Sequence, residues 1–246
     1  MLVLQLDALD PLARLGDWLT EAGAELEVVR ADEQPVPSSL AGYQGLVVLG
    51  GGMGALDDLE FPWLADVRKL LSHAVAKRVP TLAICLGAQL LATATGGQVR
   101  RGPKGPEVGV LLVAKRDASG RDPLFADLPW TPDVLQFHED EIHLLPPSAE
   151  LLAASPKYDN QAFRVGQCAY GLQFHIESTP EIVLDWALSA PDKAACARSG
   201  QLDHDRLVEG HADMAAVWQP FTNRFVRLVS GELTPMGHSG IDLPLV

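Results

Sequence analysis

The chain has 246 residues, of which 47% are hydrophobic, and a formal net charge of −13. This composition favours a packed globular protein with one large domain, or a domain plus an extension, over a disordered chain. The negative charge argues against nucleic-acid binding because it repels phosphate backbones, and no apolar run approaches the length of a membrane span.

The compartment is predicted from the N-terminus and the cysteines. Residues 1–7 carry no basic group ahead of their apolar stretch, which argues against a secretory signal. The cysteines are odd in number and widely dispersed: Cys85, Cys168 and Cys196. This usage suits a reducing compartment rather than a disulfide framework, so we expect a cytoplasmic protein.

Strand-like and helix-like segments alternate through the N-terminal part of the chain. Apolar runs predict strands at residues 1–6, 26–29, 46–49 and 81–84, and helical spacing predicts helices at 11–22, 61–77 and 87–94. The repeated order of strand and helix predicts a doubly wound, mostly parallel α/β sheet. The functional crevice of such a sheet lies at the carboxyl ends of its strands.

Shorter strands are expected further along the chain. They are predicted at residues 108–114, 134–138, 151–154, 162–165 and 169–174. We interpret them as a mixed or antiparallel extension of the sheet. This extension would bring His175 back to the turn that carries Cys85.

The C-terminal region carries a continuous apolar stripe at helical spacing. Its members are Leu207, His211, Met214, Trp218, Phe221, Phe225 and Leu228. Pro220 is expected to kink or split this helix near Trp218. The simpler interpretation is a helix packed on the protein's own core, and the alternative is a homodimer or partner surface. Residues 231–246 are rich in Pro and Gly and receive no assignment.

One segment has the context of a catalytic cysteine. Residues 80–89 read P-T-L-A-I-C-L-G-A-Q, an apolar strand followed by Cys85 at a tight turn and then a helix. The positive N-terminal end of that helix would favour a thiolate. A buried structural cysteine is the common alternative, and we accept it for Cys168 and Cys196, which lack such surroundings.

A second segment offers a base and its orienting group. Residues 171–177 read G-L-Q-F-H-I-E and are expected to lie on a strand, so that His175 and Glu177 project to the same side. Together with Cys85 they complete a nucleophile, a base and a group that fixes the tautomer of the base. The two segments therefore predict covalent acyl transfer.

Two further motifs concern ligand binding. The glycines of residues 50–54 would let backbone N–H groups approach a ligand, but the Lys-Ser/Thr ending of a phosphate loop is absent. The spacing of His138 and His143 does not fit the H-E-x-x-H zinc helix, and on a strand the two would face opposite ways. We therefore predict no metal site.

These motifs resemble those of the class I glutamine amidotransferases, which read G-x-C-x-G-x-Q and H-P-E, and most closely the stand-alone, GMP-synthase-like branch of that family. Residues 49–54, 107–109 and 136–140 support the resemblance, which runs from residue 1 to about 189. It implies a flavodoxin-like fold, with an amidotransferase domain at residues 1–190 and a C-terminal helical extension and tail at 191–246.

The resemblance also implies roles for single residues. The N–H groups of Gly51 and Leu86 would form the oxyanion hole. The substrate would be bound by residues matching the family's glutamine pocket: Gly52, Gln89, His138 and Asp140.

The chain departs from the family pattern at four positions. Ala83 replaces a glycine, Gly52 a common proline, and Ile176 the proline between His and Glu. These changes leave the triad groups in place. Glu139 replaces a glycine beside the amino-acid end of the substrate, where its carboxylate would either disfavour the α-carboxylate of glutamine or recruit a positive group.

The predicted function is that of a glutaminase-type amidotransferase, which uses no cofactor and cleaves the side-chain amide of glutamine through a cysteinyl thioester with release of ammonia. One alternative keeps this triad but cleaves γ-glutamyl peptides or γ-glutamyl amines. Another is a non-catalytic regulatory subunit. Any ammonia-accepting synthetase would be a separate chain, because nothing after residue 189 resembles a synthetase domain.

Overall fold

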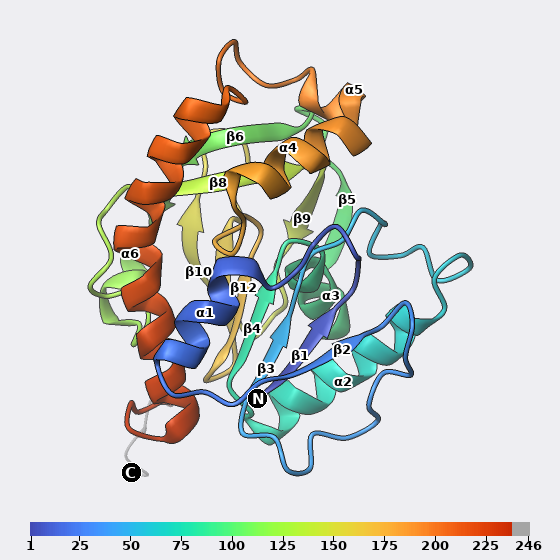
Figure 1. Cartoon of the computed structure of the whole chain (residues 1–246). Coiled ribbons are helices and arrows are strands. Elements are labelled where there is room, and N and C mark those ends of the chain that lie inside the picture. The colour runs from blue at the N-terminus through green and yellow to red at the C-terminus, as the bar shows by residue number, and fades with distance from the viewer. Residues whose placement is uncertain (238–246) are drawn as a thin grey trace, which may run out of the picture.

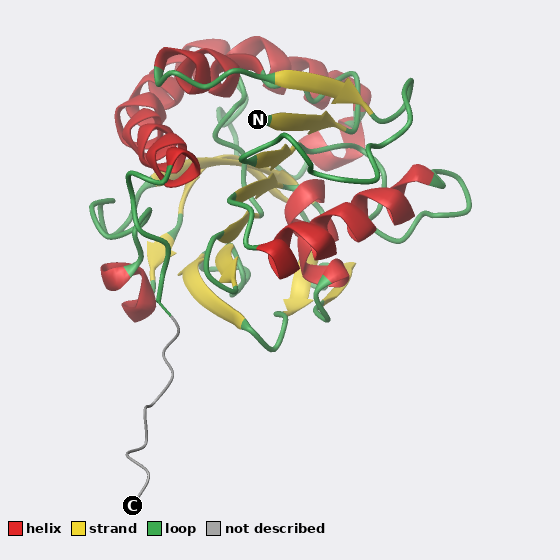
Figure 2. Ribbon diagram, turned by 90° about the horizontal axis from the view of Figure 1, so that it is seen from below, coloured by secondary structure: helices red, strands yellow, loops and turns green. Residues whose placement is uncertain are grey.

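A computed structural model describes residues 1–237 as an eight-stranded sheet with helices on both faces (Figures 1 and 2). The strand order is β2-β1-β3-β4-β12-β11-β10-β7. From β2 to β12 all neighbours pair in parallel, an order typical of flavodoxin-like folds. The predicted fold class is confirmed.

Where apolar runs predicted an element, its observed bounds lie close to the predicted ones. The main sheet contains β1 (Leu2–Gln5), β2 (Glu27–Arg30), β3 (Leu46–Val48), β4 (Thr81–Ile84), β7 (Ala114–Lys115), β10 (Ala149–Ala154), β11 (Ala162–Val165) and β12 (Ala169–Leu172). The helices are α1 (Ala13–Glu21), α2 (Trp63–Lys77), α3 (Leu86–Ala94), α4 (Pro180–Ser189), α5 (Pro191–Ala194) and α6 (His204–Ser230), with a 3₁₀ turn at Asp117–Arg121.

Alternate residues of the central strands enter two different cores. In β1, Val3 packs in the core that includes α1 and α6, whereas Leu2 and Leu4 pack in the core that includes α2 and α3. Successive side chains of a strand point to opposite faces of a sheet. Coverage of both faces explains why the strands read as unbroken apolar runs.

The antiparallel part of the molecule carries the second half of the site. Strands β11, β10 and β7 extend the main sheet in antiparallel pairing. Two small sheets pair β6 (Glu107–Leu112) with β8 (Asp133–His138) and β5 (Gln98–Arg101) with β9 (Asp140–Leu144). Leu135 in β8 forms an isolated bridge with His175. Strand β12, which pairs antiparallel with β11 and in parallel with β4, returns His175 to the sheet edge that carries Cys85, as predicted.

The C-terminal stripe is buried against the protein's own core. All its residues, from Leu207 to Leu228, are at most 3% exposed, and the helix packs on α1, α4 and β8. This confirms the simpler interpretation and removes the stripe as a surface for a partner. Pro220 does not split α6, which is continuous across it (Figure 1). Pro220 itself is exposed, so the carbonyl of Ala216 that loses its helical partner lies on the solvent side of the helix.

Several predicted boundaries were wrong. The strand predicted at 169–174 ends at Leu172, and the chain then bends, so His175 and Glu177 do not lie on a regular strand. The segment predicted at 108–114 is divided between β6 and β7. Elements β5, β9, α4 and α5 were not predicted. The unassigned tail lies partly outside the described residues, from 238 onward.

No helix within residues 1–237 is both long and apolar enough to cross a membrane. The longest, α6, is polar on the face away from the core.

Candidate active site

Cys85 occupies the sharp turn between β4 and α3. Its φ of +49° lies in the left-handed region that residues with a side chain rarely adopt, and such strain costs on the order of 1–3 kcal/mol and is concentrated at functional sites. Gly87 permits the turn, because a Cβ there would lie 2.3 Å from the carbonyl oxygen of Val48. The side chain of Cys85 thus starts at the positive end of α3.

His175 and Glu177 meet in the bend after β12. The Nδ1 atom of His175 lies 2.6 Å from Oε1 of Glu177, and the N–H of Ile176 donates to Oε2 of the same carboxylate at 2.9 Å. The backbone of His175 is held by Leu135, whose carbonyl accepts its N–H at 2.8 Å. The side chains of His175 and Glu177 are buried, and Trp186 packs on the imidazole with 4.5 Å between ring centroids.

The environment favours a charged imidazole. Burial alone would lower the pKa of His175, but the charges of Glu177 and Cys85, with hydrogen bonds to both, raise this pKa well above its usual value. An imidazolium beside Cys85 stabilises the thiolate, the form of cysteine that attacks carbonyl groups. The structure thus brings together the three residues predicted as the triad.

Two glutamine side chains link the nucleophile to the helix behind it. The amide of Gln89 donates to Gln173 at 3.2 Å, and the amide of Gln173 lies 3.8 Å from Sγ of Cys85. All three are buried. Gln173 was not predicted as a site residue. It stands two residues before His175, so on the strand predicted there its side chain would project to the same side as the base.

The predicted oxyanion donors lie beside the nucleophile. Among the described residues, neither the N–H of Gly51 nor that of Leu86 donates a hydrogen bond to a protein acceptor. A Cβ on Gly51 would lie 2.9 Å from Cδ2 of Leu86 and 2.7 Å from Sδ of Met53. The absence of a side chain at Gly51 therefore lets this loop approach Leu86 closely, and two N–H groups without a protein acceptor beside Cys85 suit an oxyanion hole.

Two cavities meet at Cys85. The His-side cavity has a volume of about 290 Å³ and is lined by His175, Trp186 and Asp10 among others. The Gln-side cavity has a volume of about 280 Å³ and is lined by residues that include Gln89, Arg101, His138, Glu139 and Asp140. Five residues line both: Gly51, Gly52, Cys85, Phe137 and Lys193.

The Gln-side cavity is lined by the predicted substrate residues and by two basic residues that were not predicted, Arg101 and Lys193. Glu139 forms an ion pair with Arg101, so its carboxylate does recruit a positive group. Burial, then the charge of Glu139, raises the pKa of Asp140, while Arg101 and Lys193 lower it. The cavity therefore offers both signs of charge, as an amino-acid end of a substrate requires.

His138 is engaged within the protein. Its Nδ1 lies 2.8 Å from the carbonyl oxygen of Asp140 and its Nε2 lies 3.1 Å from Glu107. Glu107 also accepts hydrogen bonds from Ser155 and Gln161. With both ring nitrogens occupied, His138 supports the wall of the cavity, and a metal ion would have to break these bonds.

Sequence reasoning missed Asp7, Asp10 and Lys193. Asp7 accepts hydrogen bonds from the N–H groups of Gly52 and Leu9. Burial, then Glu177 and Asp7, raise the pKa of Asp10 to about 7, against opposing contributions from His175 and Lys193. The signal for both acids was present, because they directly follow the first strand, at the same edge as Cys85.

Comparison with known proteins agrees with this geometry. A family model described as "Glutamine amidotransferase class-I" matches residues 13–182. The crystal structure of a glutamine amidotransferase from Thermotoga maritima superposes with a TM-score of 0.79 at 29% identity, covering 92% of this chain and 96% of that one.

Two relatives with named activities are similar over shorter stretches. Gamma-glutamyl peptidase 4 of Arabidopsis thaliana is 29% identical over 62% of this chain and 61% of its own length. A glutamine-hydrolysing GMP synthase subunit of Pyrococcus furiosus is 38% identical over 46% of this chain and 58% of its own length. The chain thus spans about three fifths of each. From the family model and the shared fold, we conclude that the chain belongs to the class-I glutamine amidotransferase family.

Proposed function

We propose that this chain hydrolyses the γ-glutamyl amide bond of glutamine through a thioester on Cys85 and releases ammonia. The observation that carries the proposal is the buried set of Cys85, His175 and Glu177 at the meeting point of two cavities. The Gln-side cavity, with its mixed charges, would hold the amino-acid end of the substrate. The His-side cavity would receive the leaving group.

The first step forms the covalent bond. The Sγ thiolate of Cys85 attacks the amide carbonyl carbon, and the oxygen that becomes negative is held by the N–H groups of Gly51 and Leu86. Collapse of this tetrahedral species breaks the C–N bond, and the departing nitrogen takes a proton from Nε2 of His175. The γ-glutamyl thioester remains on Cys85.

The second step returns the enzyme to its starting state. Water attacks the thioester carbonyl while His175 accepts its proton, and breaking the C–S bond yields glutamate and the thiolate. Glu177 keeps a proton on Nδ1 throughout, so that Nε2 is the atom that exchanges protons.

The test is release of glutamate and ammonia from glutamine by the purified chain. We expect Cys85→Ala to abolish release and Cys196→Ala, a matched change at an exposed cysteine, to leave it intact. Stoichiometric labelling of Cys85 by a glutamine-like electrophile would argue against the non-catalytic alternative. Equal release by the Cys85→Ala variant would overturn the proposal.

A second candidate function is hydrolysis of γ-glutamyl peptides or γ-glutamyl amines by the same triad. The volume of the His-side cavity favours it, because about 290 Å³ far exceeds the roughly 10–15 Å³ that a cavity needs to hold one molecule the size of water or ammonia. Faster cleavage of γ-glutamyl amides than of glutamine would select this candidate. Failure to cleave any of them would eliminate it.

Ammonia transfer would need a second protein. One relative is named as a subunit of a GMP synthase, and on this basis we propose that an ammonia-accepting synthetase, if the chain serves one, is a separate chain. Homodimer formation remains a prediction. Light scattering of the purified chain, alone and with a candidate synthetase, tests both.

A further inference from the structure

The inference concerns the His-side cavity and rests on the proposed function. We propose that this cavity is a leaving-group subsite in which Asp10 binds a second, positively charged nitrogen of the departing amine. The substrate class is then a γ-glutamyl amide of a short diamine or of a similar cationic amine.

Asp10 is a buried carboxyl without a protein partner. It is 7% exposed and lines the cavity. Within residues 1–237 its carboxyl makes no hydrogen bond, in contrast to Asp7, which is bonded to two backbone N–H groups. The carboxyl oxygens are not sealed from solvent, because Oε1 of Gln136 is the one fully buried side-chain polar atom without a partner among the described residues. An N–H donor of a ligand in the cavity can therefore reach them, and this bond would offset the cost of the largely buried carboxyl.

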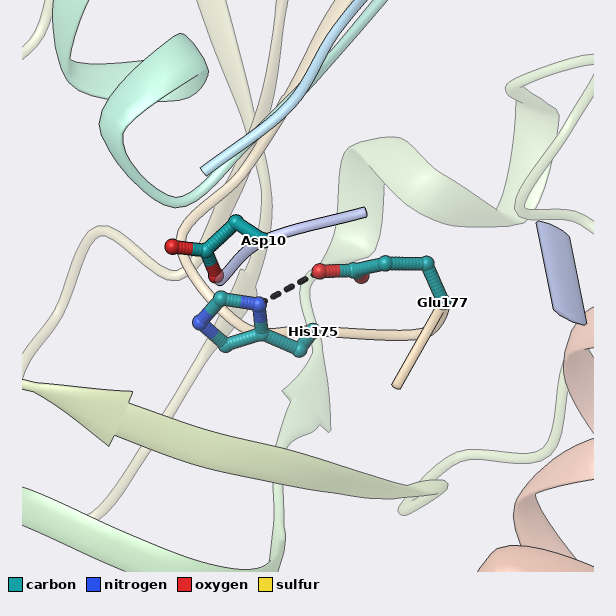
Figure 3. A group of neighbouring side chains, drawn as sticks. All are labelled: Asp10, His175 and Glu177. Atoms are coloured by element: carbon teal, nitrogen blue, oxygen red, sulfur yellow. Dashed lines mark hydrogen bonds and ion pairs between the residues drawn. The ribbon is translucent and has the colours of Figure 1, made fainter. Parts of the chain in front are cut away.

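The position of Asp10 places it where a leaving group would go. Figure 3 shows its carboxyl beside the imidazole of His175, which is the group that would protonate the departing nitrogen. One carboxylate oxygen of Asp10, one ring nitrogen of His175 and one carboxylate oxygen of Glu177 all lie within 4.8 Å of one another. A nitrogen bound by Asp10 would therefore be separated from the scissile nitrogen by a short spacer.

The walls of the cavity suit the spacer. Leu9 and Trp186 line it on the side away from the Gln-side cavity, and the indole N–H of Trp186 is engaged with the carbonyl of Leu9 at 2.7 Å, which leaves its ring as an apolar surface. Methylene groups between two nitrogens would pack there.

The surrounding charges leave Asp10 as the group available to a cation. Those that face it are Asp7, His175, Glu177 and Lys193. Asp7 and Glu177 are already hydrogen-bonded. Lys193 also lines the Gln-side cavity and lies 5.2 Å from the centre of the Phe137 ring, so it stands at the junction of the two cavities.

The test compares two substrates of nearly equal shape. γ-Glutamyl-4-aminobutylamide carries a terminal ammonium, and γ-glutamyl-pentylamide replaces it with a methyl group. We expect the wild-type chain to favour the cationic substrate in kcat/KM by about tenfold or more, as befits a hydrogen bond to a charged group. Asp10→Asn removes most of this preference, whereas Asp17→Asn, the same change at an exposed site on α1, retains it.

A second measurement needs no variant. Because the pKa of Asp10 is raised to about 7, its carboxyl is mostly neutral at pH 6 and mostly charged at pH 8. The preference for the cationic substrate should therefore rise across this range. Taking the ratio of the two substrates cancels the pH dependence of the shared triad.

The outcomes separate this inference from the proposed function. Turnover of glutamine or the pentylamide, with no preference for the ammonium at either pH, overturns the inference and leaves the function standing. A preference that Asp10→Asn retains in full also overturns it. Absence of Cys85-dependent turnover on every γ-glutamyl amide overturns both.

Discussion

Replacing Glu177 with Gln tests whether the carboxylate controls the proton of the base. Glu177 accepts two donors at once, the Nδ1–H of His175 at 2.6 Å and the backbone N–H of Ile176 at 2.9 Å. A glutamine has one acceptor oxygen. If that oxygen stays with Ile176, the amide NH₂ faces Nδ1, and His175 must move its proton to Nε2, the wrong atom for accepting a proton.

The magnitude follows from the burial of this pair. Glu177 and His175 are 1% and 2% exposed, so their bond is a charge-assisted hydrogen bond without competing water. Such a bond is worth about 1.5–3 kcal/mol, which corresponds to a loss of roughly 10- to 150-fold in kcat. The pKa of His175, which the charge of Glu177 helps to raise, should fall in the variant.

Two assays read these effects separately. Single-turnover cleavage of a γ-glutamyl amide reports the loss in rate, and alkylation of Cys85 by iodoacetamide across pH 5–9 reports loss of the imidazolium as slower labelling at neutral pH. Glu209→Gln, an exposed change of the same kind on α6, serves as control. A Glu177→Gln rate within twofold of wild type, with an unchanged alkylation profile, would show that the carboxylate does not control the proton of His175.

Two further predictions concern stability. Trp218→Ala removes a fully buried indole whose N–H donates to the carbonyl of Asp133 at 2.9 Å. We expect the free energy of unfolding to fall by about 3–5 kcal/mol and the Tm by roughly 6–20 °C, whereas Val208→Ala on the exposed side of α6 should change little. A small effect of Trp218→Ala would contradict the packing of α6. Asp10→Asn should stabilise the fold more at pH 8 than at pH 5. The folded chain holds the Asp10 proton up to about pH 7 while the unfolded chain loses it near 3.8, so wild-type stability falls across this window by up to about 4 kcal/mol. Equal stabilisation at both pH values in urea unfolding would contradict this.

The parallel half of the fold was predictable because burial on both faces leaves an unmistakable apolar run. Strand β4 was predicted at its observed bounds for this reason. Strand β5 was missed because it is paired with β9 while its residues Gln98, Arg100 and Arg101 remain exposed, so no apolar alternation marks it. Helix α4 did carry a start signal, since the hydroxyl of Thr179 accepts from Ile182 and Pro180 occupies the first turn.

The site was predictable in part for a related reason. Cys85, His175 and Glu177 are recognisable from residue type and spacing, and their meeting required only that the extension turn back toward the elbow. Arg101 ends β5 whereas Glu139 lies in the bend between β8 and β9, and which acidic group a basic one pairs with depends on side-chain placement in three dimensions. The isolation of Asp10 is equally a property of the folded state, because a carboxyl in a sequence looks the same whether or not it finds a donor.

Two energetically unfavourable features of this chain lie at the same edge of its sheet. Cys85 holds a left-handed backbone conformation, and burial raises the pKa of the Asp10 carboxyl, because the charged form loses its hydration there. The strain at Cys85 has an evident use, since it presents the sulfur at the start of α3. In the proposed cleavage of glutamine no step uses Asp10, because the leaving ammonia is small and takes its proton from His175. The buried carboxyl of Asp10 beside the catalytic base destabilises the fold and has no role in cleaving the smallest substrate. A site for a larger, cationic leaving group would require such a carboxyl.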